Sequence, residues 1–129
     1  MHVDKDLVAA SATPLVLAIL AEGESYGYAI LRRVEELSAG RMTWTDGMLY
    51  PLLHRLDRLG YVTSSWGAAP TGRRRKHYAV TPAGLEALAE RRRQWEVVSA
   101  ALGRVWQELA SPADGAGGTL AGPAPAGAL

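Results

Sequence analysis

The stretch that decides the fold is residues 61–80, which read YVTSSWGAAPTGRRRKHYAV. Residues 61–66 are rich in β-branched and aromatic side chains, a composition that favours a strand. Residues 67–72 have the composition of a turn, and residues 73–80 then form the returning strand. We therefore predict a two-stranded β-hairpin at this point of the chain.

Two predicted helices lead into this hairpin. Apolar side chains recur at helical spacing between about residues 25 and 38, and Gly40 ends that segment. Thr45 is a suitable cap for the next helix, at about 46–59, which Gly60 ends. The leucines of this helix are expected to face the core; they are Leu49, Leu52, Leu53, Leu56 and Leu59.

Another helix comes before these two, and its start has two interpretations. The apolar run at residues 15–21 indicates the helix itself. In one interpretation Thr13 is the cap and Pro14 is the first helical residue, where a missing N–H has no consequence. In the other, the helix begins near Asp4 and bends at Pro14.

After the hairpin, Thr81 and Pro82 are a cap and a first helical residue, and the helix is expected to run to about Leu109. The order is therefore three helices, a hairpin and a long helix. We expect a mainly α fold with a two-stranded β-hairpin, namely a winged helix-turn-helix followed by a long C-terminal helix. In this fold the third helix enters the major groove of DNA and the hairpin, or wing, lies along the backbone.

The predicted organisation has three parts. These are a winged helix-turn-helix domain at 1–81, a C-terminal dimerisation helix at 82–110 and a tail at 111–129. The tail contains six Ala, five Gly and three Pro, and Asp114 is its only charged side chain. Such a segment buries too little apolar surface to offset the entropy of ordering it, so we expect the tail to be disordered.

The composition excludes several classes of protein. The 129 residues are 48% hydrophobic and 21% charged, which is typical of a soluble globular protein. A net charge of +1 does not by itself indicate a nucleic-acid binder, so that function depends on where the charges lie. The absence of cysteine excludes disulfides and cysteine-ligated zinc, and it fits a cytoplasmic protein. No apolar run approaches the ~20 residues of a membrane span.

The helix at 46–59 carries residue types that suit DNA. One face away from the leucines carries Tyr50, His54 and Arg58. A neighbouring face carries Gly47, Pro51 and Arg55. Such side chains meet phosphates and base edges, although a solvated amphipathic helix would have the same pattern. Pro51 lacks the N–H that would bond to the carbonyl of Gly47, so it should strain the helix.

The returning strand begins with four consecutive positive charges, Arg73, Arg74, Arg75 and Lys76. Because side chains alternate along a strand, about two of them can face one surface. One interpretation is a phosphate clamp, which gives affinity but little sequence information. The alternative is a solvated run of charges.

The last helix carries a heptad-like seam. The residues that step by three and four are Leu85, Leu88, Arg92, Trp95, Ser99, Leu102, Trp106 and Leu109. The rest of the domain is too small to cover so long a stripe, so we expect a two-fold homodimer. The predicted dimer contacts are Leu88, Trp95, Leu102, Trp106 and Leu109.

Trp95 has two interpretations. Two copies near a dimer axis, beside Arg92 and Ser99, would form an aromatic ligand slot. Alternatively, Trp95 is simply part of the dimer core.

The sequence offers little support for catalysis. His2, His54 and His77 are far apart, and no pair of histidines has metal-ligand spacing. There is also no recognised hydrolase arrangement and no phosphate-cradling glycine loop. We therefore predict that the protein is not an enzyme and that it has no catalytic residue, cofactor or metal.

Five segments together resemble the PadR family of bacterial transcriptional regulators. They are LVLAILAEGESYG at 15–27, GMLYPLL at 47–53, LGYV at 59–62, RKHY at 75–78 and TPAG at 81–84. They occur in the family's order and at its spacing, and the resemblance covers about residues 14–95. The combination of the Leu-Tyr-Pro stretch with the Arg-Lys-x-Tyr strand is fairly specific.

The resemblance implies a dimeric winged-helix repressor that binds inverted repeats near promoters and is released by a small effector. Tyr28, Tyr50, the start of the third helix and the basic wing match positions that the family uses against DNA. The residues expected to contact double-stranded DNA are Tyr28, Thr45, Gly47, Tyr50, Pro51, His54, Arg55, Arg73, Arg74, Arg75 and Lys76.

The single helix after the wing resembles a short-chain subgroup of the family. Some members of this subgroup bind planar hydrophobic drugs between paired tryptophans at the dimer centre, and Trp95 resembles that tryptophan. Three consecutive arginines at 91–93 make this neighbourhood more basic. An anionic or neutral planar aromatic effector would therefore suit it better than a cationic drug.

We therefore predict a ligand-responsive dimeric repressor that binds DNA in the cytoplasm. Two alternatives belong to other classes. One is a winged-helix protein-interaction module, which the near-zero net charge allows. The other is a ligand-sequestering dimer without specific DNA binding.

Overall fold

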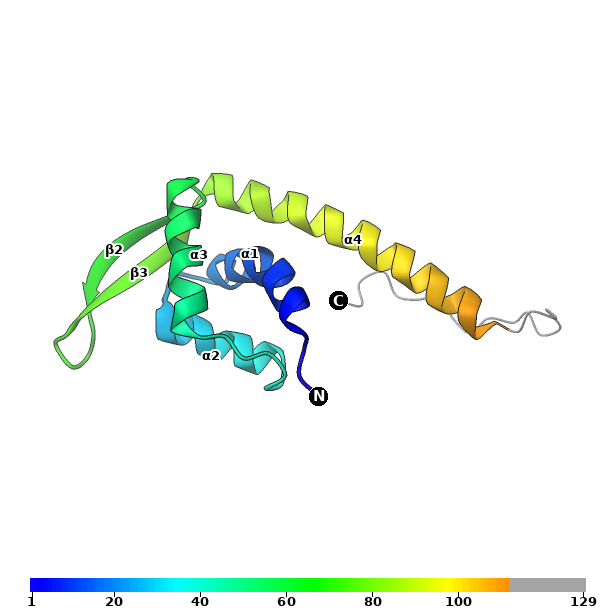
Figure 1. The fold of residues 1–129 in the computed structure, drawn as a ribbon. Helices are drawn as coiled ribbons and strands as arrows, with labels where there is room; N and C mark the ends of the chain where they lie inside the picture. Colours follow the sequence, from blue (N-terminus) through cyan, green and yellow to red (C-terminus); the bar gives the residue numbers. More distant parts are fainter. Residues whose placement is uncertain (112–129) are drawn as a thin grey trace. The chain divides into compact units, whose positions relative to one another are not determined.

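The structure is a computed structural model that describes residues 1–111 (Figure 1). The elements are α1 (Lys5–Ala21), β1 (Ser25–Tyr26), α2 (Gly27–Leu37), α3 (Asp46–Arg58), β2 (Val62–Ala68), β3 (Arg74–Val80) and α4 (Pro82–Ala110). The first compact unit is Met1–Leu88, and a second begins at Ala89 within α4. The predicted mainly helical winged helix-turn-helix is confirmed. The segment predicted to be a disordered tail lies, from residue 112 onward, outside the described residues.

The first helix follows the second of the two interpretations. α1 begins at Lys5, and the carboxylate of Asp4 caps it by accepting a hydrogen bond of 3.0 Å from the backbone N–H of Asp6. Pro14 lies inside the helix. Thr13 is therefore not a cap. It lies within α1, and its side chain is buried.

The predicted β2–β3 hairpin is confirmed, but the sheet has a third strand, β1, that was not expected. The order is β1–β3–β2, with antiparallel pairing throughout. β1 pairs Ser25 with Tyr78 and Tyr26 with His77, in a segment that the sequence assigned to the start of a helix. A strand of two residues has no periodicity to detect, and it forms because β3 offers it an unpaired edge.

The observed boundaries of α3 are close to those predicted from the sequence. The Thr45 side chain accepts a hydrogen bond of 3.3 Å from the N–H of Met48, which confirms the cap. The helix ends at Arg58, and Gly60 takes a positive φ of 80° to turn the chain into β2. Leu59 was expected in the core but is 55% exposed, because it lies at the C-cap, past the last residue that the helix holds against the core.

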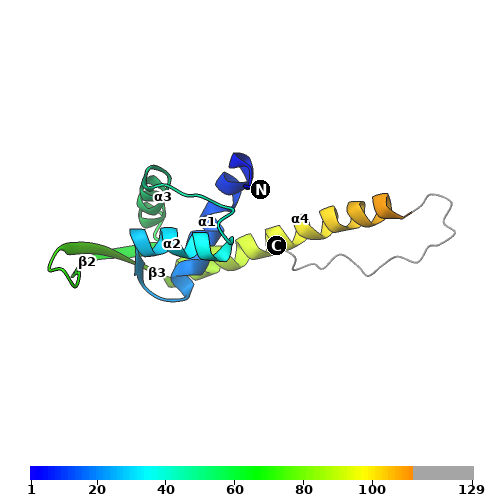
Figure 2. The same cartoon turned by 90° about the horizontal axis from the view of Figure 1, so that it is seen from below.

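The wing differs slightly from its prediction. β2 continues through Gly67 to Ala68, two residues into the predicted turn, and Arg73 precedes β3 rather than belonging to it. Gly72 takes a positive φ of 87° in the connection. Figure 2 shows the β2–β3 hairpin extending beyond the helices of its own unit.

The core of the first unit lies between the three helices and one face of the sheet. Its fully buried side chains come from five elements: Val16, Leu17 and Leu20 in α1, Ile30 and Val34 in α2, Leu49, Leu53 and Leu56 in α3, Val62 in β2 and Tyr78 in β3. α3 is thus fixed by its leucine face, which leaves its opposite faces exposed.

The start of α4 is joined to the end of α3 by one side chain. The Thr81 hydroxyl donates a hydrogen bond of 2.6 Å to the carbonyl of Gly60 and accepts one of 3.0 Å from the N–H of Gly84, so the predicted cap is confirmed. Gly84 is buried, and a Cβ at this position would overlap the carbonyl oxygen of Tyr61. Glycine is therefore required here for the close approach of two backbones.

The second unit consists of the rest of α4. Large apolar side chains along it are exposed: Val97, Val98, Leu102, Val105, Trp106 and Leu109. No helix within residues 1–111 is long and apolar enough to cross a membrane.

We predict that Gly84→Ala destabilises the protein by about 1–3 kcal/mol, because the methyl group is forced against the Tyr61 carbonyl. Gly47→Ala is the matched control, since its Cβ meets nothing closer than 3.8 Å and alanine favours a helix. Thermal and urea unfolding followed by circular dichroism measure both effects. Equal stability of the two variants would contradict the packing described for Gly84.

Candidate nucleic-acid interface

A groove in the first unit brings together residues from five elements. Its volume is about 590 Å³, and we call it the basic groove; its lining residues are Tyr26, Gly27, Tyr28, Tyr50, His54, Trp66, Arg74, Arg75, Lys76 and Tyr78. Six of these residues were predicted to contact DNA: Tyr28, Tyr50, His54, Arg74, Arg75 and Lys76. The groove therefore combines positive charge with aromatic rings.

On the wing, the two faces of β3 carry different cations. Arg74 and Lys76 lie on the face of Trp66, with the guanidinium carbon 5.0 Å and the ammonium nitrogen 5.8 Å from the indole centroid. Arg75 points to the other face and lies 3.8 Å from the centroid of the Tyr26 ring. Stacking on aromatic rings holds each long side chain beside the groove without neutralising its charge.

Trp66 is 59% exposed although it is a large aromatic residue. It stands directly opposite Lys76 in the β2–β3 pairing. Its role was not visible in the sequence, because its contact with Arg74 and Lys76 depends on the register of the hairpin. The alternation of strand side chains, combined with that register, is the signal that would have found it.

At the other side of the groove, Tyr50 of α3 packs on the first residue of α2. A Cβ on Gly27 would overlap the Tyr50 hydroxyl, so Gly27 allows the phenol to lie against the helix start. Tyr50 is 39% exposed and Tyr28 is 62% exposed. The N-cap residue of α2, Tyr26, makes no side-chain capping bond, so the first turn of α2 keeps N–H groups available near the groove.

Tyr78 forms the floor of the groove. It is 2% exposed, and burial raises the pKa of its hydroxyl, with smaller contributions from Tyr50 and Asp57. Within residues 1–111, two buried side-chain polar atoms have no hydrogen-bond partner, the Tyr78 hydroxyl and the indole nitrogen of Trp44.

The other predicted contact residues lie outside the lining of the groove. Thr45 and Gly47 are exposed at the start of α3, and Pro51 and Arg55 are exposed further along the same helix. Arg73 is exposed in the connection that precedes β3. The start of α3 therefore offers a polar, uncovered surface next to the residues that line the groove.

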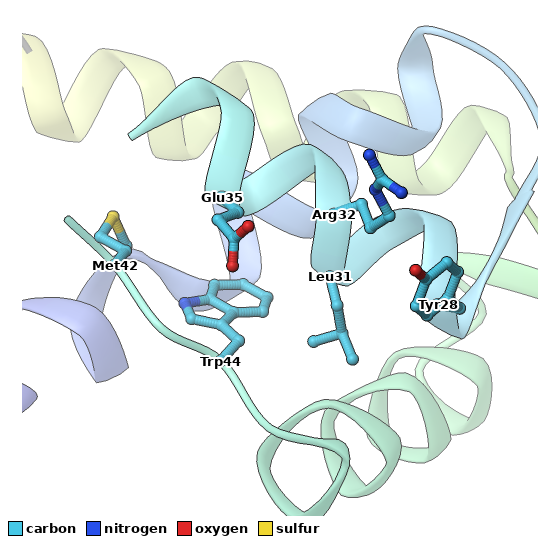
Figure 3. Close-up of a pocket in the computed structure, with 6 residues that line it drawn as sticks. All are labelled: Tyr28, Leu31, Arg32, Glu35, Met42 and Trp44. Atoms are coloured by element: carbon cyan, nitrogen blue, oxygen red, sulfur yellow. The ribbon is translucent and has the colours of Figure 1, made fainter. Parts of the chain in front are cut away.

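A second hollow lies between α2 and the loop that leads to α3 (Figure 3). Its volume is about 290 Å³, and we call it the Trp44 hollow; it is lined by Tyr28, Leu31, Arg32, Glu35, Met42 and Trp44. Sequence analysis did not identify it. The helical spacing of residues 28, 31, 32 and 35 puts them on one face, but nothing in the sequence shows that the loop returns against that face.

In the second unit, the predicted seam has an apolar line beside it. Trp95, Val98, Leu102, Val105 and Leu109 step by three and four and are all apolar, whereas the predicted seam passed through Arg92 and Ser99. Trp106 lies beside this line, and Arg92 is 3.4 Å from the carboxylate of Glu96. Trp95 is half-buried. Val98 and Val105 are both about half exposed.

Within the described part of the chain, no group of three or more His, Cys, Asp or Glu side chains is arranged to hold a metal ion.

Comparison with known proteins identifies the family. The sequence profile of the transcriptional regulator PadR-like family matches residues 16–90. The chain is 30% identical over 84 residues to the transcriptional regulator YqjI of Escherichia coli, covering 65% of this chain and 39% of that protein. It is 44% identical over 62 residues to a transcriptional regulator of Mycobacterium tuberculosis, covering 48% of this chain and 57% of that protein.

The chain thus spans less than two thirds of the length of either relative. A solved structure of a PadR-like transcriptional regulator from Bacillus cereus is similar over 80% of this chain and 98% of that one, with a TM-score of 0.70 and 26% identity. The family profile covers more than half of the chain and includes all three strands together with α2 and α3. This chain belongs to the PadR-like family of transcriptional regulators.

Proposed function

We propose that this protein regulates transcription by binding DNA, as a dimeric repressor. The observation that carries the proposal is the basic groove, in which α2, α3 and both wing strands surround about 590 Å³. Cationic side chains bind phosphate oxygens, and exposed aromatic rings make apolar contacts with sugars and bases. Membership of the PadR-like family supports the same function.

In the proposed complex, α3 enters the major groove of DNA. Its leucine face is buried, so its exposed faces are the ones available to DNA. Thr45 and Gly47, at the start of the helix, bring the backbone close to phosphates, and Tyr50, His54 and Arg55 face base edges. Pro51 is exposed on the same surface. Tyr28, at the first turn of α2, contacts the adjoining phosphates.

The wing acts as a phosphate clamp in this proposal. Arg73, Arg74, Arg75 and Lys76 supply the charge, and the aromatic rings under three of them fix the directions of their side chains. A preorganised cation loses less side-chain entropy when it binds a phosphate than a free one does. The wing therefore adds affinity that does not depend on DNA sequence.

We predict that Arg74→Ala weakens binding to every DNA sequence alike and lowers the slope of log affinity against log salt by ~0.9. Fluorescence anisotropy with labelled duplexes at several salt concentrations measures both quantities. Arg104→Ala is the matched control, because it removes one arginine that is 82% exposed and pairs with Glu108, outside the winged unit. An unchanged slope in Arg74→Ala would contradict the role of the wing.

We also predict that Trp66→Ala reduces DNA affinity about fivefold, or about 1 kcal/mol, while the salt slope stays as in the wild type. The reason is that the exposed indole contacts DNA and orients Arg74 and Lys76, while its removal leaves both of their charges in place. The same anisotropy titration tests this. If the slope fell as it does in Arg74→Ala, the ring would only position Arg74 and Lys76, and the direct contact would be wrong.

The proposed dimer forms through α4. Trp95, Val98, Leu102, Val105 and Leu109 span an arc of about 80° on a helical wheel. A second copy of the same face covers such a stripe in an isologous, two-fold interface. Two recognition helices related by this symmetry match an inverted repeat whose half-sites lie about one DNA turn apart.

We predict that Leu102→Asp converts the dimer into monomers, because a carboxylate in the seam is buried without a partner. Val97→Asp is the control, since Val97 is 70% exposed and lies on a different face of the same helix. Sedimentation equilibrium gives the mass of each variant. A wild type that is monomeric, or a dimer that survives Leu102→Asp, would contradict the proposed interface.

The finer part of the proposal concerns ligand control. Trp95 lies within the seam, so a dimer would bring two indole rings near its axis, beside Arg92 and Ser99. A planar aromatic effector between these rings would alter the separation of the two recognition helices. It would release the DNA only if it binds the two dimer geometries with unequal affinity.

A further inference from the structure

The Trp44 hollow has a different chemistry from the basic groove, although Tyr28 lines both. One wall is the face of α2 that carries Leu31 and Glu35, and the other is the loop with Met42 and Trp44. The loop is held in place: the Ser38 hydroxyl accepts a hydrogen bond of 3.0 Å from the N–H of Met42, and the carbonyl of Arg41 accepts one of 2.9 Å from the N–H of Val3. The hollow is therefore a built feature of the first unit.

The charged side chains around the hollow differ in whether they have an ion-pair partner. Within residues 1–111, the Glu35 carboxylate takes part in no ion pair and no hydrogen bond, whereas that of the next residue, Glu36, lies 3.3 Å from Arg33. Arg32, which also lines the hollow, lies with its guanidinium 5.9 Å from the centroid of the Tyr28 ring. Tyr28 raises the pKa of Arg32, with smaller contributions from Glu36 and Glu35.

Figure 3 shows how these groups point. The Glu35 carboxylate is directed toward the indole of Trp44, while the guanidinium of Arg32 is turned away from it. The face of an aromatic ring is electron-rich, so an indole and a carboxylate that line one hollow both attract positive charge. The C-terminal turn of α2 adds the negative end of the helix dipole, and it contains no basic residue.

The geometry points to a binding site for a small organic cation, an ammonium group carried on a short or flat hydrocarbon. The ammonium would lie between Glu35 and the Trp44 indole, and the hydrocarbon would contact Leu31 and Met42. A volume of about 290 Å³ lies just below the roughly 300–1,000 Å³ range of ligand pockets, so the ligand is small.

A ligand in this site would be next to the start of α3, the proposed recognition helix. Trp44 directly precedes Thr45, the residue that caps α3, and it is 7% exposed within the core. A ligand that presses on Trp44 therefore acts on the start of α3 through one peptide unit. This consequence, unlike the binding itself, rests on the proposed DNA-binding function.

The experiment is a titration of the full-length protein with phenethylamine, followed by the indole N–H signals in ¹H–¹⁵N correlation spectra. The chain has four tryptophans, and single Trp→Phe variants assign their signals. The uncharged analogue phenethyl alcohol is the ligand control. Glu35→Gln is the test variant and Glu36→Gln is its matched control, because Glu36 is adjacent but does not line the hollow.

We expect the Trp44 signal to shift with saturation by the amine and to respond at least tenfold more weakly to the alcohol. Glu35→Gln should weaken amine binding at least tenfold, and Glu36→Gln should leave it unchanged. Equal responses to amine and alcohol, or equal binding by Glu35→Gln and the wild type, would overturn the site. A shift of Trp95 in place of Trp44 would also overturn it, since the ligand would then occupy α4.

Because this titration needs no DNA, its outcome is independent of the proposed function. The coupling is tested separately by measuring DNA affinity with and without saturating phenethylamine. A change of at least twofold in the wild type that is absent in Glu35→Gln supports control through α3. The same DNA affinity in both conditions would overturn the coupling.

Discussion

The pairing of β3 on both of its edges is the constraint on which the first unit depends. One edge holds β2 and so defines the wing, and the other holds β1, whose last residue leads directly into α2. Tyr78 marks the centre of this arrangement: it pairs with Ser25 on one side and Ser64 on the other, and its ring is buried in the core. The wing, the first turn of α2 and the exposed side of α3 are therefore held around one groove rather than as separate contacts.

Much of this fold could be predicted from the sequence because its boundaries are set by local chemistry. Thr45 and Thr81 cap helices with their own side chains, and Gly60 ends α3 in a conformation that other residues rarely adopt. The hairpin follows from β-branched residues around a turn. What the sequence could not reveal is β1, because its two residues form a strand only by virtue of a partner more than fifty residues away. Leu59 was assigned to the core for a similar reason, since apolar character alone does not locate the last turn of a helix.

The candidate site also has one part that the sequence predicts and one part that it does not. Its cations were visible as a run of four charges, and Tyr50 and His54 were visible from helical spacing. The aromatic rings that orient those cations were not, because the contacts of Trp66 and Tyr26 with Arg74 and Arg75 arise from strand register. The Trp44 hollow was hidden for a further reason: one of its walls is an irregular loop, turned by positive φ values at Ala39 and Gly40. In this protein, the sequence pattern locates charge and helical faces, whereas hollows depend on tertiary contacts.

The central claim is that α3, the start of α2 and the wing form one DNA-binding surface. Hydrogen–deuterium exchange of the full-length protein, with and without a duplex taken from upstream of its own coding sequence, tests this most directly. The account predicts that DNA slows exchange at the start of α2, along α3 and in β2–β3, and that a scrambled duplex protects these segments less. No protection by either duplex at low salt, or protection confined to residues 89–110, would contradict the account. Such a result would favour a winged-helix module that binds a protein partner.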